Sequence, residues 1–298
     1  MDALVAALGE EVADPEEETF LLFSRPSSPS SVSGSSGNLG FIDPKADELE
    51  ISVAGKDLTI RQFPNLLVSN RAEGTTGAVV WKINPPFADW LASHENNFLF
   101  RLGILGADSK VVELGSGVSG VVALSLSPSV GQYIATDQNY VLRHLRTNIE
   151  NNAHVFQPHR RSGHGNTPRL ALSKNAPLSH SKYTVQELDW ESSLIHQMPD
   201  LQDTNMIIAV DCVYNEALVD PLIRTCADIC RFRTEAKENI NRHPCICLIG
   251  QQLRSEDVFE YFMEKFVILF RVWRVPEDLL SEDLGKESRF VIHVGILR

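Results

Sequence analysis

Three glycines at positions 115, 117 and 120 follow a short apolar run that ends at Leu114. Glycine lets the backbone turn sharply, approach a ligand closely and pack a helix against a sheet. The helix expected after such a turn also offers free N–H groups to a ligand. The G-x-G-x-x-G spacing is that of a dinucleotide-binding turn, so it predicts a nucleotide-cofactor site. A structural turn that binds nothing is the alternative.

Acidic residues end two later strands of the predicted core. Asp137 lies 22 residues after Gly115, where a carboxylate can accept hydrogen bonds from both ribose hydroxyls of a nucleoside. Asp211 ends another predicted strand, and Tyr214 follows it. Glu113 stands two positions before the first glycine, where dinucleotide sites usually carry an apolar or small residue. Together with an antiparallel pair of strands expected at the end of the chain, Glu113 favours S-adenosylmethionine over NAD.

Alternating strands and helices are predicted to position these residues. Apolar runs predict strands at 110–114, 132–137, 183–190, 205–211, 245–250, 267–275 and 290–297. Helices are expected between them at 119–127, 139–153, 217–232 and 255–266. The last two strands have no room between them for a long crossover helix, so we expect them to be antiparallel neighbours. The pattern predicts an α/β fold with a seven-stranded, mostly parallel, Rossmann-like sheet, an antiparallel last strand and helices on both faces.

The region before this core has a different composition. Residues 1–47 are acidic and contain a Ser/Pro-rich stretch, so we predict a flexible tail. The catalytic domain is expected over 48–298, with a hairpin and a helix of about 86–102 within 48–108 and the core over 109–298. A polar stretch at 154–182 is predicted to be an exposed insertion.

Charge and cysteine usage narrow the class of protein. The formal net charge is −12, and eleven Asp and Glu against two basic residues in the first 50 positions supply most of it. Such a chain is poorly suited to nonspecific binding of nucleic-acid phosphates. The five cysteines have no zinc-like spacing and an odd count, so we expect buried, reduced thiols and no metal site. No apolar run reaches the ~18 residues of a membrane span, and residues 1–22 lack the features of a secretory signal, so we expect a chain that is not exported.

Several of these residues together resemble a known family. The stretch Glu113-Leu114-Gly115-Ser116-Gly117, followed by Asp137, Asp189-Trp190 and Asp211-Cys212-Val213-Tyr214, resembles the seven-β-strand methyltransferases. It is most similar to the protein-lysine methyltransferases that carry a D-x-x-Y motif after the fourth strand, and the resemblance covers roughly residues 75–298. It implies a class I methyltransferase fold with S-adenosyl-L-methionine as the cofactor.

The resemblance also implies roles for the matching residues. Asp137 matches the ribose ligand, Trp190 an aromatic residue near the adenine, and Trp81 the tryptophan of a G-x-x-V-W stretch that packs near the cofactor. An apolar and aromatic slot suits an adenine ring. The implied cofactor-binding residues are Trp81, Glu113, Gly115, Ser116, Gly117, Asp137, Trp190 and Val210, and the implied catalytic residues are Asp211 and Tyr214.

A lysine acceptor must lose a proton before it can attack a methyl group, because its usual pKa is about 10.4. Burial and a nearby sulfonium favour the neutral amine, while Asp211 would attract the ammonium and then orient the amine. Tyr214 would form a wall of the channel. The plainer alternatives are that Asp211 caps the following helix and that Tyr214 and Trp81 are ordinary core residues.

Residues 20–26 and 211–222 are similar to fungal members of this branch that act on ribosomal proteins. This similarity implies a protein substrate, namely a lysine of a large-subunit ribosomal protein, and a cytoplasmic monomer, with the nucleus left open. No membrane or direct nucleic-acid binding is expected, since Asp-Cys-Val-Tyr lacks the proline pair common in nucleic-acid amino methylation. The alternatives are a methyltransferase acting on RNA or a small molecule, a noncatalytic cofactor-binding scaffold and, more remotely, an NAD oxidoreductase.

Overall fold

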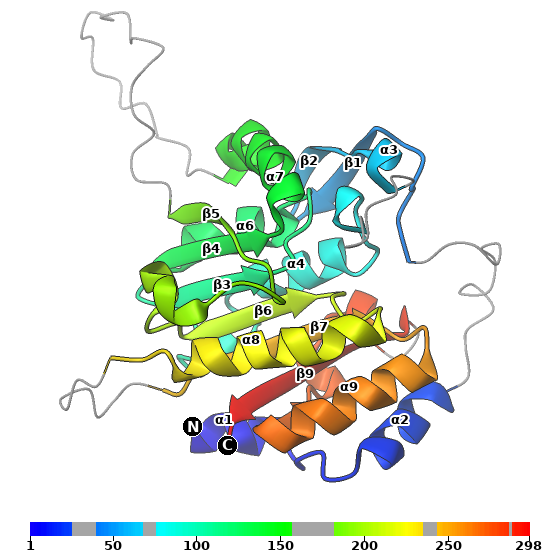
Figure 1. Ribbon diagram of the computed structural model, residues 1–298, viewed down its shortest axis with the longest axis vertical. Helices are drawn as coiled ribbons and strands as arrows, with labels where there is room; N and C mark the ends of the chain where they lie inside the picture. Colours follow the sequence, from blue (N-terminus) through cyan, green and yellow to red (C-terminus); the bar gives the residue numbers. More distant parts are fainter. Residues whose placement is uncertain (26–39, 68–75, 157–181, 235–242, 286–287) are drawn as a thin grey trace, which may run out of the picture.

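A seven-stranded sheet forms the centre of the computed structural model, which describes residues 1–25, 40–67, 76–156, 182–234, 243–285 and 288–298 (Figure 1). The strand order is β5-β4-β3-β6-β7-β9-β8. The strands are β3 (Lys110–Leu114), β4 (Gln132–Asp137), β5 (Tyr183–Glu187), β6 (Met206–Val210), β7 (Ile246–Gln252), β8 (Phe270–Arg274) and β9 (Phe290–Leu297).

The pairing of these strands confirms the predicted sheet. From β5 through β7 all neighbours are parallel, and β9 runs antiparallel to both β7 and β8. All five residues of β6 are buried, as expected for a strand covered on both faces. The parallel strands bring the end of β3, the end of β4 and the end of β6 to the same edge of the sheet.

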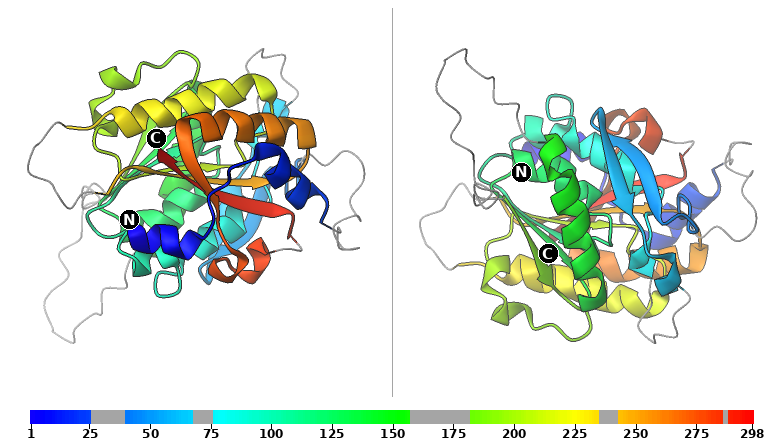
Figure 2. Two further views of the ribbon diagram at one scale, coloured as in Figure 1. Left: turned by 90° about the horizontal axis from the view of Figure 1, so that it is seen from below. Right: turned by 90° about the horizontal axis from the view of Figure 1, so that it is seen from above.

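Helices cover both faces of the sheet, and the sheet separates the core into two apolar layers (Figure 2). One face is covered by α4 (Asn84–Ala92), α6 (Val121–Leu126) and α7 (Asn139–Asn152), and the other by α8 (Val219–Arg231) and α9 (Glu256–Leu269). The single helix expected at 86–102 is wrong. It is two helices, α4 and α5 (Phe98–Arg101), because the side chain of Asn97 accepts a hydrogen bond from the N–H of Leu99 and starts a new helix.

The predicted hairpin is present as β1 (Glu48–Val53) and β2 (Lys56–Arg61), which form a separate two-stranded sheet. Side chains of α7 hold β2 in place. Asn148 accepts a hydrogen bond from the N–H of Arg61, and Asn152 accepts one from the N–H of Thr59, each at 3.0 Å. The amide groups therefore satisfy backbone donors that would otherwise lie at an unpaired edge.

The first 25 residues differ from the predicted flexible tail. They form α1 (Asp2–Leu8) and α2 (Pro15–Phe23), which lie on opposite faces of the sheet beside its β8 edge (Figure 2). Leu4, Leu8 and Leu22 are buried in the two core layers. Between the helices, the N–H of Val12 donates to the carbonyl of Val272 at 2.7 Å, so this segment covers part of the edge strand.

The acidic residues that suggested a solvated tail have specific partners. Glu11 pairs with Arg271 and Arg298, both at 2.8 Å, and the buried Glu18 contacts His293 and Arg274. These partners are more than 250 positions away in the chain, so local composition could not reveal them. The Ser-rich stretch 26–39 and most of the predicted insertion, 157–181, lie outside the described residues.

Shorter elements complete the described chain. They include α3 (Pro64–Leu67), η2 (Thr76–Ala78), η7 (Glu216–Leu218) and further single turns of 3-10 helix. All five cysteines are buried and unbridged, as predicted. Within the described ranges, no helix combines the length and the apolar character needed to cross a bilayer.

Candidate active site

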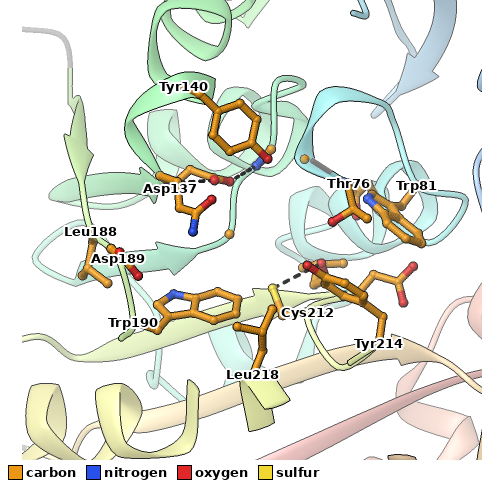
Figure 3. Close-up of a pocket in the computed structure, with 17 residues that line it drawn as sticks. Thr76, Trp81, Asp137, Tyr140, Leu188, Asp189, Trp190, Cys212, Tyr214 and Leu218 are labelled. Carbon is orange, nitrogen blue, oxygen red and sulfur yellow. Dashed lines mark hydrogen bonds between the residues drawn. The ribbon is translucent and has the colours of Figure 1, made fainter. Parts of the chain in front are cut away.

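A cavity opens at the edge of the sheet where β3, β4 and β6 end (Figure 3). Asp137 and Tyr140 lie on one side of it, Trp190 and Leu218 lie opposite, and Thr76, Trp81 and Tyr214 close the other end. Eight of the ten residues singled out from the sequence line this cavity: Trp81, Gly115, Gly117, Asp137, Trp190, Val210, Asp211 and Tyr214. The other two, Glu113 and Ser116, are buried outside its lining.

The glycine turn needs glycine for two reasons. Gly115 has φ +68°, a conformation that side chains disfavour, and a Cβ atom there would lie 2.7 Å from Sγ of Cys212 and 3.2 Å from Trp190. Gly120 also has positive φ, and a Cβ atom there would lie 2.5 Å from Ile149 of α7. Gly115 therefore allows Cys212 and Trp190 to approach the turn closely, and Gly120 allows the turn to pack closely against α7.

Asp137 connects the end of β4 to this turn. Its Oδ2 accepts a hydrogen bond from the N–H of Gly117 at 2.8 Å, and its Oδ1 accepts one from the N–H of Gln138 at 2.7 Å. Burial raises the pKa of Asp137 to about 6, although these two hydrogen bonds favour the carboxylate. The side chain is thus a hydrogen-bond acceptor in the cavity wall above that pH.

Glu113 lies behind the turn and does not face the cavity. Its Oε2 accepts a hydrogen bond from the hydroxyl of Tyr133 at 2.9 Å, and both side chains are buried. Burial raises the pKa of Glu113 to about 7, even though the Tyr133 hydrogen bond favours its charged form. Glu113 supports the strand that carries the turn.

The segment around Trp81 forms the far wall. Its Gly77 carbonyl accepts a hydrogen bond from the N–H of Val118 at 2.8 Å, which fixes the segment against the glycine turn. Trp81 packs against Phe41 with the rings tilted and their centroids 4.5 Å apart, and its ring centroid lies 6.0 Å from that of Tyr214. Asn84 lines the cavity, and its Oδ1 is buried without a hydrogen-bond partner. That oxygen is an acceptor available to a ligand's N–H or O–H group.

Asp211 follows β6 with φ +60°, which is uncommon for a residue with a side chain. Its Oδ1 accepts a hydrogen bond from the N–H of Gln252 at 3.1 Å, and its Oδ2 forms an ion pair with Arg254. Burial raises the pKa of Asp211, while the positive charge of Arg254 acts in the opposite direction. Asp211 does not cap the next helix, because the side chain of Asn215 accepts the hydrogen bond at the start of η7.

A second cavity adjoins the first. Thr76, Trp81 and Tyr214 line both cavities. The second one is otherwise lined by residues that follow β6, end β7 or begin α9: Val213, Gln251, Gln252, Arg254, Ser255, Val258 and Phe259. The two cavities therefore meet at the wall formed by Trp81 and Tyr214. Such an arrangement suits a site that brings two molecules together.

A sequence profile described as lysine methyltransferase matches residues 61–162 and 168–263, about two thirds of the chain. The chain belongs to this family. Ribosomal lysine N-methyltransferase 5 of Zygosaccharomyces rouxii is 30% identical over 234 residues, covering 72% of each chain. A Schizosaccharomyces pombe protein named diaminohydroxyphosphoribosylamino-pyrimidine deaminase is 26% identical over 93% of this chain, and the match covers 56% of that longer protein.

Among solved structures, a SAM-dependent methyltransferase of Streptococcus mutans aligns with 84% of this lysine methyltransferase and 56% of its own chain. The TM-score is 0.46 and the sequence identity is 9%.

The methyl donor of lysine methyltransferases is S-adenosyl-L-methionine, and the cavity fits such a molecule. A nucleoside requires acceptors for its ribose hydroxyls and an apolar slot for its base. The carboxylate of Asp137 is available as such an acceptor, and Leu188, Trp190 and Leu218 form an apolar, partly aromatic part of the same lining. The unpartnered Oδ1 of Asn84 offers a further acceptor, and Gly115 and Gly117 add no side chains to the lining.

Sequence reasoning about this lysine methyltransferase missed several lining residues. Tyr140 and Leu218 lie in the first turns of helices that follow β4 and β6. Their positions just after predicted strand ends could have identified them as lining residues. Asn84 follows the Trp81 segment and starts α4. The role of Arg254 could not be predicted from the sequence, because its contact with Asp211 joins residues 43 positions apart.

Proposed function

We propose that the protein transfers a methyl group from S-adenosyl-L-methionine to the ε-amine of a lysine on a ribosomal protein, specifically one of the large subunit. The observation that carries the proposal is the shared wall of Trp81 and Tyr214, with Asp211 beside it, between two adjoining cavities. The names of the fungal relatives support the ribosomal part. Such a substrate is encountered in the cytoplasm.

The chain's own residues would hold the cofactor in the first cavity. Asp137 accepts hydrogen bonds from the ribose hydroxyls, and Trp190 packs against the adenine. Gly115 and Gly117 allow the methionine portion to approach the backbone, with Val210 beside it. When bound, the cofactor supplies an electrophilic methyl group attached to a positively charged sulfur.

The acceptor lysine would enter through the second cavity. Methyl transfer requires the amine, the methyl carbon and the sulfur to lie in line, so positioning supplies much of the catalysis. The aromatic faces of Trp81 and Tyr214 line the passage, and the negative charge of Asp211 lies next to it. Aromatic faces and a carboxylate both attract an alkylammonium group, and removal from water favours loss of its proton.

The surface around this entrance suits a basic protein segment. Glu256 and Asp257 are exposed in the first turn of α9, directly after Ser255 of the second cavity. Partial burial, together with repulsion from Glu16, Glu264 and these two residues, raises the pKa of Glu260. Ribosomal proteins are rich in Lys and Arg, so charge complementarity favours such a substrate over RNA.

The test compares the protein with its Asp211→Asn variant on purified ribosomal subunits and radiolabelled cofactor. We expect label in one large-subunit protein, at a lysine identified by mass spectrometry. Asp211→Asn should lower turnover at least tenfold while cofactor affinity, measured by calorimetry, changes less than threefold. Tyr214→Phe should have a smaller effect.

Three results would each contradict part of the proposal. Label that enters RNA would exclude a protein substrate, and an unchanged rate in Asp211→Asn would remove the acceptor role of that residue. Label in a small-subunit protein would leave the lysine chemistry intact but would refute the large-subunit assignment.

A further inference from the structure

We propose that, in the free protein, the guanidinium of Arg254 occupies the place that the ammonium group of the acceptor lysine takes when the substrate binds. The acceptor must therefore displace Arg254 before methyl transfer. This inference rests on the proposed function, because it takes the acceptor to be a lysine. It makes Arg254 a residue that determines which side chains can enter.

The contacts of Arg254 are those that a buried cation requires. Its Nη2 forms the ion pair with Oδ2 of Asp211, whose side chain is 0% exposed, while the Arg254 side chain is 21% exposed. The guanidinium carbon lies 4.8 Å from the ring centroid of Trp81. One carboxylate and one aromatic face therefore hold the positive charge from two sides.

A lysine ammonium would use the same two groups. It is a compact cation that pairs with carboxylates and packs over aromatic rings, as a guanidinium does. The described residues beside Asp211 in this part of the wall offer no second carboxylate, because Gln251 and Gln252 are neutral amides. Two cations cannot both pair closely with Oδ2 of Asp211, so Arg254 and the acceptor compete for it.

The ion pair stands at the boundary between the two cavities. Asp211 lines the cofactor cavity, and Arg254 lines the adjoining one. A side chain that reaches the cofactor cavity from the second cavity must pass this pair and the Trp81–Tyr214 wall. Displacement of Arg254 therefore opens the route by which an amine reaches the methyl donor.

Arg254 is placed where it can move. It lies between the end of β7 at Gln252 and Ser255, which caps α9, so its rotation breaks no hydrogen bond of either element. Its Nε is buried without a partner, so one donor of the guanidinium is unsatisfied in the closed arrangement. Gln251, which lines the same cavity, also has both amide atoms buried without partners. An entering peptide group can satisfy these donors and acceptors.

Exchange of one cation for another keeps the carboxylate of Asp211 paired throughout. Removing Arg254 with nothing in its place would leave a buried charge without a partner, which is costly. A cationic or hydrogen-bonding side chain that reaches Asp211 avoids that cost, whereas an apolar side chain does not. The arrangement thus selects for a lysine and against an apolar residue at the entrance.

The decisive experiment places an amine where the guanidinium now lies. The Arg254→Lys variant, incubated with S-adenosyl-L-methionine and no other acceptor, should become methylated at position 254. Mass spectrometry of the peptide that contains this position measures the modification. The matched control is Arg224→Lys, whose side chain is 72% exposed on α8, and it should stay unmodified at position 224.

The second variant, Arg254→Met, removes the competing charge and keeps a long side chain. We expect the KM of this variant for the ribosomal substrate to be three- to tenfold lower than that of the protein without the substitution, with a smaller change in kcat. Calorimetry with the demethylated cofactor product verifies that the variant is folded. A KM that is unchanged or raised would overturn the competition between Arg254 and the acceptor.

The two hypotheses fail in different ways. If the unmodified protein methylates a ribosomal protein but folded Arg254→Lys carries no methyl group at position 254, the inference about Arg254 is wrong and the proposed function stands. If Arg254→Lys is methylated at position 254 but no ribosomal protein accepts label, the inference stands and the ribosomal substrate is wrong.

Discussion

The Nε2 atom of His293 lies 3.0 Å from Oε1 of Glu18, although 275 positions separate the two residues. Arg274 contacts the other oxygen of Glu18 at 3.3 Å. Burial raises the pKa of Glu18, but the hydrogen bond and charges from His293 and Arg274 outweigh it, so the net pKa is lowered. The helix α2 is therefore held to β8 and β9 by a buried, charged contact.

Glu18→Ala should strongly destabilise the protein, because it leaves the buried partners of the carboxylate unpaired. We expect the free energy of unfolding to fall by about 3 kcal/mol, measured by urea denaturation. Glu17→Ala on the same helix is the control, since Glu17 is exposed, and it should change stability by less than about 0.5 kcal/mol.

The contribution of Glu18 to the free energy of unfolding should be present at neutral pH and be lost as the pH falls below about 4.5, through the lowered pKa of this residue. Equal effects of the two variants would show that α2 is not held by this contact.

Gly115→Ala should destroy the cofactor site as well as strain the backbone. The added Cβ would lie 2.7 Å from Sγ of Cys212 and 3.2 Å from Trp190, at the floor of the cavity. Gly103→Ala is a matched control, because Gly103 has nearly the same φ, +69° against +68°, and nothing within 4 Å of an added Cβ. We expect Gly103→Ala to cost about 1 kcal/mol of stability and to leave cofactor affinity intact. Calorimetry with S-adenosyl-L-methionine should show a loss of more than tenfold for Gly115→Ala alone.

Asp137→Asn should weaken cofactor binding about 30-fold, or about 2 kcal/mol, since hydrogen bonds to a charged acceptor are replaced by weaker ones. The unmodified protein should also lose affinity as the pH falls through about 6, because protonation removes the carboxylate that accepts the ribose hydroxyls. Titration calorimetry from pH 5 to pH 8 measures both effects. The pH dependence should disappear in Asp137→Asn and persist in the exposed control Asp108→Asn; its persistence in Asp137→Asn would assign it to another group.

Glu113→Gln should change how stability depends on pH. Burial raises the pKa of Glu113 from 4.5 to about 7, so the folded chain holds this proton over a range where the unfolded chain has released it. Glu113 therefore makes the folded state less stable as the pH rises from about 4.5 to 7, by a total of about 3 kcal/mol. Relative to the unmodified protein, Glu113→Gln should become more stable by that order between pH 5 and pH 8. A difference that does not vary with pH would show that Glu113 is ionised throughout.

The sequence by itself determined the core of the fold and most of the cofactor cavity. Apolar runs of strand length and the glycine turn are local features, and parallel strands necessarily bring Gly115, Asp137 and Asp211 to one edge of the sheet. The connection before β9 is too short for a long crossover helix and likewise favoured an antiparallel neighbour. These conclusions needed no knowledge of distant contacts.

Only the tertiary structure decided which charged residues are buried and what they pair with. Glu18 belongs to a stretch whose composition is that of a solvated tail, and its burial depends on His293 and Arg274 at the other end of the chain. The ion pair of Asp211 with Arg254 likewise depends on β6 and β7 lying side by side. A carboxylate's partner is set by the three-dimensional packing of whole elements, whereas a glycine's conformation is set by its own backbone. For that reason the turn was predictable and the charged contacts were not.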